Sequence, residues 1–210
     1  MDQNRPAEIA NNKEEVPLQF YLERFPMIDP EERAEQLGVP FENGAFTVTM
    51  LGVTYRIAWP TGEVSSEDPE AIAVRKIPGQ IMLLRYLMEG SNALGTGAYK
   101  TFREMPWGEV YIKPFTGRCL MRSAFKFGTN LAGFRKGAEN SGGTALSHGD
   151  AGYSFPFIGP YELQIFVWEG DDEFPPSSQI LYSDNFAAGF SAEDCVVAAE
   201  LMIGTIAAHM

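Results

Sequence analysis

The chain has 210 residues, of which 45% are hydrophobic and 21% charged, a composition typical of one globular domain. Its formal net charge of −12 repels phosphate backbones, which excludes nucleic acid as the main partner. The longest apolar stretch, residues 196–208, is interrupted by Glu200 and is too short to cross a bilayer, so we expect no membrane association.

Cysteine and histidine are scarce, with two of each in the chain. Zinc and iron–sulfur sites need several such ligands at suitable spacing, so we expect no built-in metal site of either kind. The first residues are polar and lack the apolar core of a signal peptide, and with so few cysteines this indicates a reducing cytoplasm. We expect a flexible polar tail over residues 1–16 and one domain over 17–210.

The domain is expected to begin with two helices. Residues 17–25 carry apolar side chains at helical spacing. Residues 30–37 follow with complete end signals, since Asp29 suits the N-cap and Gly38 suits the C-terminal cap. Residues 45–59 then change to a period of two and predict a β-hairpin that turns at Leu51 and Gly52.

Residues 69–89 return to a helical pattern, with a break expected near 77–79 because Pro78 removes a backbone donor. The glycine-rich middle of the chain is harder to read. Within it, residues 109–113 predict a strand, and residues 118–128 and 131–143 predict two short helices that each end at glycine.

Three further strands and a helix complete the expected fold. Residues 153–158 predict an edge strand, because Pro156 cannot donate to a central ladder. Residues 163–169 contain an unbroken apolar run that suggests burial on both faces, and residues 179–183 are their expected hairpin partner. A last helix begins at Ser191. The predicted class is α+β, a mostly antiparallel sheet with helices packed against it and the C-terminal helix on the sheet.

An acidic segment separates those last two strands. Asp171 and Glu173 alternate along an extended chain, so their side chains can converge on one side, and two close carboxylates suit acid–base work or a divalent cation. The alternative is a solvated turn in which the carboxylates cap backbone N–H groups. Both interpretations remain open at this stage.

Other residues are weaker candidates for chemistry. His148 lies two residues from Asp150 in a glycine-rich loop, where it is either a proton-transfer group or a solvated side chain. Cys119 is flanked by cations but has no obvious histidine partner, which favours a buried structural thiol. The candidate catalytic residues are Asp171, Glu173 and His148, and the candidate binding residues are Trp168, Asp171, Glu173, Asp184, Arg103 and Arg118.

Several motifs resemble the DUF3786 family, a domain of unknown function from anaerobic bacteria and archaea. They are "GDDEFPP" followed by "QILYSDN", a last helix that opens with "SAED", and the earlier segments "FTVTMLGVTYRIAWPTGEV", "IMLLRYLMEG" and "FREMPWGEVYIKPFTGR". The resemblance covers residues 17–208 and is most specific at Trp168, Gly170, Asp171, Glu173, Phe174 and Pro175. It implies one cytoplasmic domain in an anaerobe and supplies no activity or cofactor.

Two classes of function follow. The favoured one is a non-catalytic accessory or binding module that works with metalloprotein or corrinoid systems of anaerobic metabolism, with an iron–sulfur or corrinoid protein as its partner. Family context and the lack of a complete catalytic motif support it. The alternative is an enzyme that uses Asp171 and Glu173, with His148, on a small substrate or through a bound divalent cation. Oligomeric state is not encoded in any pattern that we identified.

Overall fold

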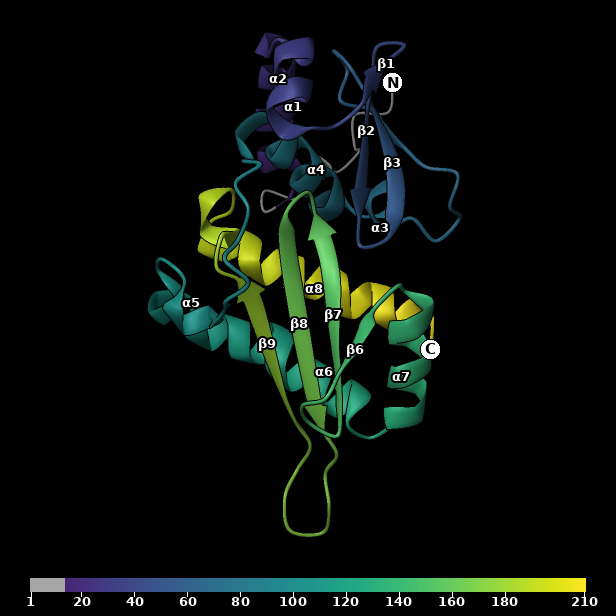
Figure 1. Ribbon diagram of the computed structural model, residues 1–210, viewed down its shortest axis with the longest axis vertical. Helices are drawn as coiled ribbons and strands as arrows, with labels where there is room; N and C mark the ends of the chain where they lie inside the picture. The colour runs from purple at the N-terminus through teal and green to yellow at the C-terminus, as the bar shows by residue number, and fades with distance from the viewer. Residues whose placement is uncertain (1–13) are drawn as a thin grey trace, which may run out of the picture.

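The computed structural model describes residues 14–210, so most of the predicted tail lies outside the described residues. Helix α1 (Glu15–Arg24) already begins inside the range expected for that tail. The chain forms two lobes, which we name the N-terminal lobe (residues 14–90) and the C-terminal lobe (residues 91–210) (Figure 1).

The N-terminal lobe packs helices against a small antiparallel sheet. Its elements in chain order are α1, η1 (Phe25–Met27), α2 (Pro30–Leu37), β1 (Phe41–Glu42), β2 (Ala45–Met50), β3 (Val53–Ala58), β4 (Val64–Ser65), α3 (Ile72–Arg75) and α4 (Ile77–Glu89). The expected caps of α2 are confirmed. Asp29 accepts hydrogen bonds from the first turn, and Gly38 adopts a left-handed conformation with φ of 66°.

The predicted hairpin and the predicted helix break are also confirmed in this lobe. Strands β2 and β3 pair antiparallel, and the turn between them holds Leu51 at φ 50° and Gly52 at φ 78°. The helical region after the hairpin begins at Ile72, later than expected, because Asp68 accepts a hydrogen bond from the Glu70 N–H and holds a turn instead. Lys76 then has extended backbone between α3 and α4.

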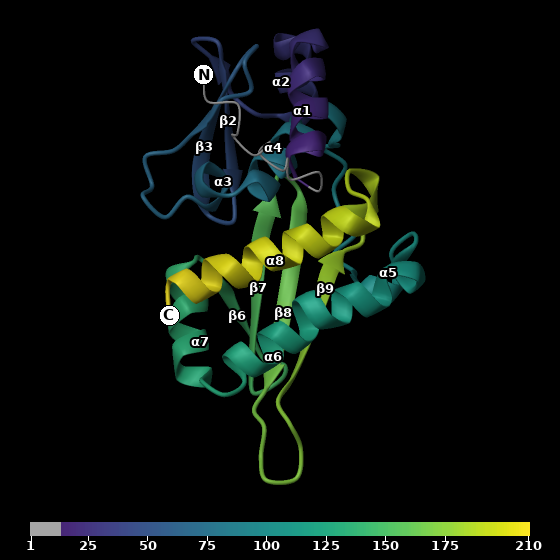
Figure 2. The same ribbon diagram turned by 180° about the vertical axis from the view of Figure 1, so that it is seen from behind.

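The C-terminal lobe consists of a longer sheet with helices on one face (Figure 2). Its elements are β5 (Tyr99–Thr101), η2 (Phe102–Glu104), α5 (Gly108–Phe115), the π-helical segment η3 (Thr116–Met121), α6 (Arg122–Phe127), α7 (Leu131–Asn140), β6 (Thr144–Leu146), β7 (Ala151–Ile158), β8 (Tyr161–Trp168), β9 (Ser177–Ser183), η4 (Phe186–Ala188) and α8 (Ala192–Ala208).

All nine strands of the described residues form one sheet with antiparallel pairing, so the predicted class is confirmed. The strand order is β4-β3-β2-β7-β8-β9-β5, with β1 beside β2 and β6 beside β7. Between the lobes, the paired residues of β2 and β7 are limited to Met50 and Ile158. The Leu51 N–H adds one bond to the Phe157 carbonyl at 2.8 Å. We call this narrow junction the seam.

The strand predicted at residues 109–113 is wrong, because these residues form helix α5. A sharp turn precedes the helix, with Trp107 at φ 66° and Gly108 packed so tightly that a Cβ there would lie 1.9 Å from the Phe102 carbonyl oxygen. Helical spacing then places Phe115 in the core, where its ring stacks on Phe102 at 4.1 Å. The short β5 occupies the sheet position beside β9.

The edge position predicted for residues 153–158 is also wrong. Strand β7 pairs with β8 on one side and with β6 and β2 on the other. Pro156 is accommodated because it falls between Ser154, the last residue paired with β6, and Ile158, the residue paired with β2. The missing N–H of the proline therefore coincides with a gap in the ladder.

The strands around the acidic segment form as expected. Ile165 and Val167 of β8 are fully buried on the helix-covered face. Phe166 on the other face is buried beneath the His148 ring, and the centroids of the two rings are 4.9 Å apart. Helix α8 begins with a capping box in which Ser191 and Asp194 bond to each other's backbone N–H. It packs on the sheet, as predicted.

Candidate functional site

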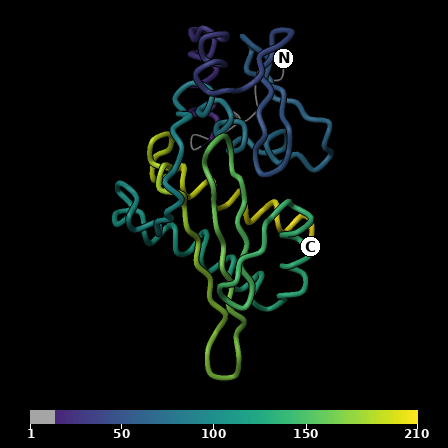
Figure 3. Tube along the Cα trace, viewed as in Figure 1, coloured from purple at the N-terminus to yellow at the C-terminus, as the bar shows by residue number. Residues whose placement is uncertain are grey.

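The acidic segment lies in the β8–β9 loop, which projects from the far end of the sheet (Figure 3). Asp171 binds its own loop there, since its Oδ1 accepts hydrogen bonds from the N–H groups of Glu173 at 2.8 Å and Phe174 at 2.7 Å. These two bonds hold the pKa of Asp171 below its usual range. The geometry is that of a carboxylate that caps backbone donors.

Glu173 does not join Asp171 in a binding pocket. Its side chain is exposed and makes no hydrogen bond or ion pair within residues 14–210, and the loop residues line none of the hollows described below. The arrangement therefore offers no support to the enzyme interpretation of the loop.

His148 and Trp168 lie together on the uncovered face of the sheet. Their rings meet edge to face with centroids 5.6 Å apart, and the His148 ring also contacts Phe166. Asp150 points elsewhere, because its Oδ2 accepts the Glu169 N–H at 2.8 Å. The structure therefore gives His148 an aromatic environment in place of the carboxylate partner that proton transfer would use.

Asp184 and Arg103 have local roles. Asp184 accepts hydrogen bonds from both the N–H and the hydroxyl of Thr96, at 3.0 and 2.5 Å, and these bonds lower its pKa. Arg103 forms an exposed ion pair with Glu109 at 3.1 Å. Arg103 and Trp168 do share the lining of a shallow hollow of about 310 Å³ beside β9.

Cys119 is a buried structural thiol. It is free and fully buried, and burial raises its pKa to about 12. A thiol in this environment stays protonated at neutral pH and is a poor nucleophile.

Arg118 is the predicted site residue that lies in a substantial groove. Its guanidinium binds Glu200 of α8 with two parallel bonds, Nε to Oε1 at 3.0 Å and Nη2 to Oε2 at 2.7 Å. Its Nη1 also binds Glu193 at 2.8 Å. The two carboxylates raise the pKa of Arg118, so the guanidinium is a permanent cation that fixes both acids.

The groove runs along α8 between the two lobes. It consists of two hollows of about 660 and 460 Å³ that share Glu14, Pro78, Val197 and Glu200 in their lining. Helices α1 and α4 form one wall of the larger hollow, and η3 and α8 form the other. We call the whole feature the α8 groove.

The larger hollow is apolar with an ionic end. Phe20 of α1 and Ile81 and Met82 of α4 supply the apolar wall. At the ionic end, Arg85 of the N-terminal lobe binds Asp194 of the C-terminal lobe at 2.8 Å. The Asp194 residue is only 5% exposed, so this pair links the lobes in a partly dry environment.

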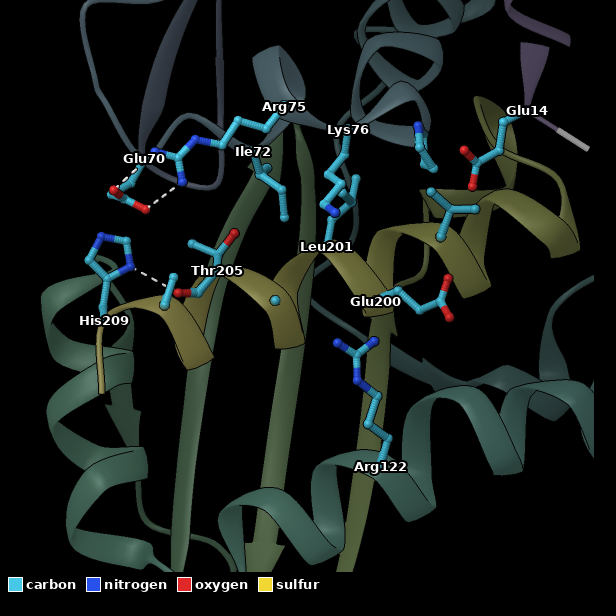
Figure 4. A pocket seen from close by; sticks show the side chains of 14 residues that line it. Glu14, Glu70, Ile72, Arg75, Lys76, Arg122, Glu200, Leu201, Thr205 and His209 are labelled. Carbon is cyan, nitrogen blue, oxygen red and sulfur yellow. Dashed lines mark hydrogen bonds and ion pairs between the residues drawn. The ribbon is translucent and has the colours of Figure 1, made fainter. Parts of the chain in front are cut away.

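The smaller hollow is more polar (Figure 4). Lys76 extends into it from the N-terminal lobe, and Arg122 extends toward it from α6. Thr205 of α8 faces the same space, and its hydroxyl is buried without a hydrogen-bond partner in the described part of the chain. Arg75, also in the lining, is bound to Glu70 at 2.8 Å.

His209 at the end of this hollow contacts a serine but is not arranged for nucleophilic catalysis. Its Nδ1 lies 2.8 Å from the Thr205 carbonyl, which requires Nδ1 to carry the proton. Ser141, 3.3 Å from the same nitrogen, donates its own proton to the Gly137 carbonyl at 2.7 Å. The nitrogen that faces the hydroxyl is thus a donor and cannot act as its base.

Sequence reasoning missed most of this groove. The candidate site residues do not include its main polar residues, namely Lys76, Arg85, Arg122, Asp194 and Thr205. Two signals were present: Glu200 interrupts an otherwise apolar helix, and Arg118 and Arg122 are one helical turn apart. Neither signal identifies the opposite wall of the groove, which is formed by residues more than 30 positions earlier in the chain.

Within residues 14–210, no group of three His, Cys, Asp or Glu side chains gathers closely enough to hold a metal ion. The helices of the same residues include none with the length and apolar character needed to cross a membrane. A family model described as a domain of unknown function, DUF3786, matches residues 29–205. No curated protein and no solved structure matches the chain.

Proposed function

The chain belongs to the DUF3786 family, whose description names no activity, and we propose from the α8 groove that the domain is a non-catalytic binding module. The groove, rather than the acidic loop, is the proposed ligand site. The observation that carries this proposal is the pair of connected hollows between the two lobes.

The dimensions and lining of the groove support ligand binding. Pockets for small ligands span about 300–1,000 Å³ and combine apolar walls with a few polar groups, often where two structural units meet. Each hollow is within that range, and the groove joins an apolar wall around Phe20 to charged groups around Glu200. A ligand with both an apolar and a charged portion fits this lining.

The charged groups favour a binding role over catalysis. Glu193 and Glu200 are both held by Arg118, and Asp194 is held by Arg85 while it caps α8. Carboxylates whose oxygens are occupied by arginine in this way are better placed to fix a geometry than to take a proton from a substrate.

The proposal keeps the partner expected from the family resemblance, an iron–sulfur or corrinoid protein of anaerobic metabolism. That resemblance is its sole support. The measured mass of the complex distinguishes a partner protein from a groove ligand. A partner protein adds the mass of a polypeptide, whereas a groove ligand adds only the mass of a small molecule.

The test is native mass spectrometry of the protein purified anaerobically from its own organism. We expect a retained small molecule on the wild type, and its loss from Val197→Trp, because Val197 lines both hollows and the indole would fill their junction. Val110→Trp is the matched control, since Val110 is 69% exposed on α5 and lies outside the groove lining.

Two results would contradict the proposal. One is a wild-type protein that carries no small molecule. The other is a ligand that survives Val197→Trp as fully as it survives Val110→Trp, which would place its site outside the α8 groove.

A further inference from the structure

Two cations of the smaller hollow approach it from opposite lobes. Lys76 lies at the break between α3 and α4, where its extended backbone directs the side chain down toward α8. Arg122 is the first residue of α6, and its side chain extends up toward the same part of α8 (Figure 4). The hollow thus receives one of these two cations from each lobe.

Neither cation forms an ion pair within residues 14–210. Three acids share the lining: Glu70 binds Arg75 at 2.8 Å, Glu200 receives two bonds from Arg118 at 2.7 and 3.0 Å, and Glu14 lines both hollows. Two unpaired cations that face one hollow are notable in a protein of net charge −12.

Thr205 supplies an independent observation. The residue is only 7% exposed, its hydroxyl has no hydrogen-bond partner among residues 14–210, and it lies on the side of α8 that faces the hollow. A buried hydroxyl without a partner is disfavoured, and a water or ion that the structure lacks is one explanation for such a group. A ligand acceptor atom in the hollow would satisfy it.

We propose that the smaller hollow is an anion subsite, which binds a carboxylate or phosphate group between Lys76 and Arg122 with a hydrogen bond from Thr205. This inference rests on the proposed function, because the anion is one end of the groove ligand. The remainder of the ligand extends past Val197 into the larger, more apolar hollow.

The test uses inorganic phosphate and acetate as probes, titrated separately into the full chain at constant ionic strength and followed by ¹⁵N NMR. We expect saturable shifts of the Lys76 and Thr205 backbone amides with at least one anion, and the tighter anion identifies the preferred group. Lys76→Gln and Arg122→Gln should each raise Kd about tenfold, the usual effect of losing one charge-assisted hydrogen bond.

Lys126→Gln is the matched control for charge. Lys126 is exposed on α6 one turn beyond Arg122 and does not line the hollow. Loss of this residue should change Kd by less than about twofold, the scale expected for a screened surface charge.

The subsite is overturned if neither anion produces saturable shifts at the hollow. Equal weakening by Lys126→Gln would also overturn it, because general charge would then explain the binding. Failure of the anion subsite can be told apart from failure of the binding-module proposal. If Val197→Trp loses the native ligand while Lys76→Gln and Arg122→Gln retain it fully, the domain is still a binding module, but the smaller hollow is not an anion subsite.

Discussion

The buried hydroxyl of Thr205 has no partner within the described residues, so we expect its replacement to have opposite effects on stability and on binding. Thr205→Val keeps the shape and removes the polar atom, and we expect the free energy of unfolding to rise by about 1 kcal/mol. The same change should weaken phosphate binding, because the donor is lost. Urea unfolding and the NMR titration measure the two effects, and a loss of stability would show that the hydroxyl is already satisfied.

Arg118 should influence the anion subsite without touching the anion. It holds Glu200 by two bonds, and its removal frees that carboxylate, which lines the same hollow as Arg122. We expect Arg118→Met to weaken phosphate binding about fivefold or more, because the freed Glu200 competes with the anion for Arg122.

The double variant Arg118→Met/Glu200→Gln checks this positioning role. Removal of the competing carboxylate should restore phosphate affinity to near that of Glu200→Gln alone. Continued weak binding in the double variant would mean that Arg118 contacts the anion itself or that its loss distorts α8.

The loop between β8 and β9 illustrates a carboxylate whose role is structural. The backbone N–H bonds lower the pKa of Asp171, so their stabilising effect is present above the ordinary carboxyl pKa of about 3.9 and is lost as pH falls through the lower folded value. We expect Asp171→Ala to speed hydrogen exchange of the Glu173 and Phe174 amides at neutral pH, with phosphate binding unchanged. Unaltered exchange would contradict the capping role.

Local signals predicted the elements that depend on local chemistry. The caps of α2 and α8 and the hairpin turn at Leu51 and Gly52 use side chains and backbone conformations that the sequence specifies directly. Residues 109–113 were mispredicted because their apolar pattern is short. Their helix is fixed by the tight turn at Gly108 and by the packing of Phe115 on Phe102, both of them tertiary contacts.

The candidate site was predicted poorly for a related reason. Of the residues selected from the sequence, Arg118 lies in the α8 groove, whereas Asp171 lies in the projecting loop at the other end of β8. The groove joins Lys76 and Arg85 to residues of α6 and α8 that follow far later in the chain. Only the packing of one lobe on the other brings these side chains together, and a single sequence contains no direct signal for that packing.

At the scale of the whole molecule, anion binding should tighten the seam between the lobes. The anion would attract Lys76 of one lobe and Arg122 of the other, while the Leu51 N–H bond to Phe157 reports on the junction of the strands. We expect phosphate to slow hydrogen exchange at the Leu51 amide in the wild type and to have no such effect in Lys76→Gln. Equal slowing of exchange in the wild type and in Lys76→Gln would show that the effect on the seam does not depend on the anion subsite.

The narrowness of the seam determines which contacts hold the two walls of the α8 groove in place. Two strands with a long shared ladder resist rotation, whereas β2 and β7 meet at one pair of residues, Met50 and Ile158. A tilt of one lobe about that pair would break few backbone hydrogen bonds, so the width of the α8 groove is held mainly by side chains, among them the Arg85–Asp194 ion pair and a buried core that is continuous through both lobes. Loss of that ion pair would therefore alter the fit of a ligand in the groove and leave the pairing of the strands unchanged.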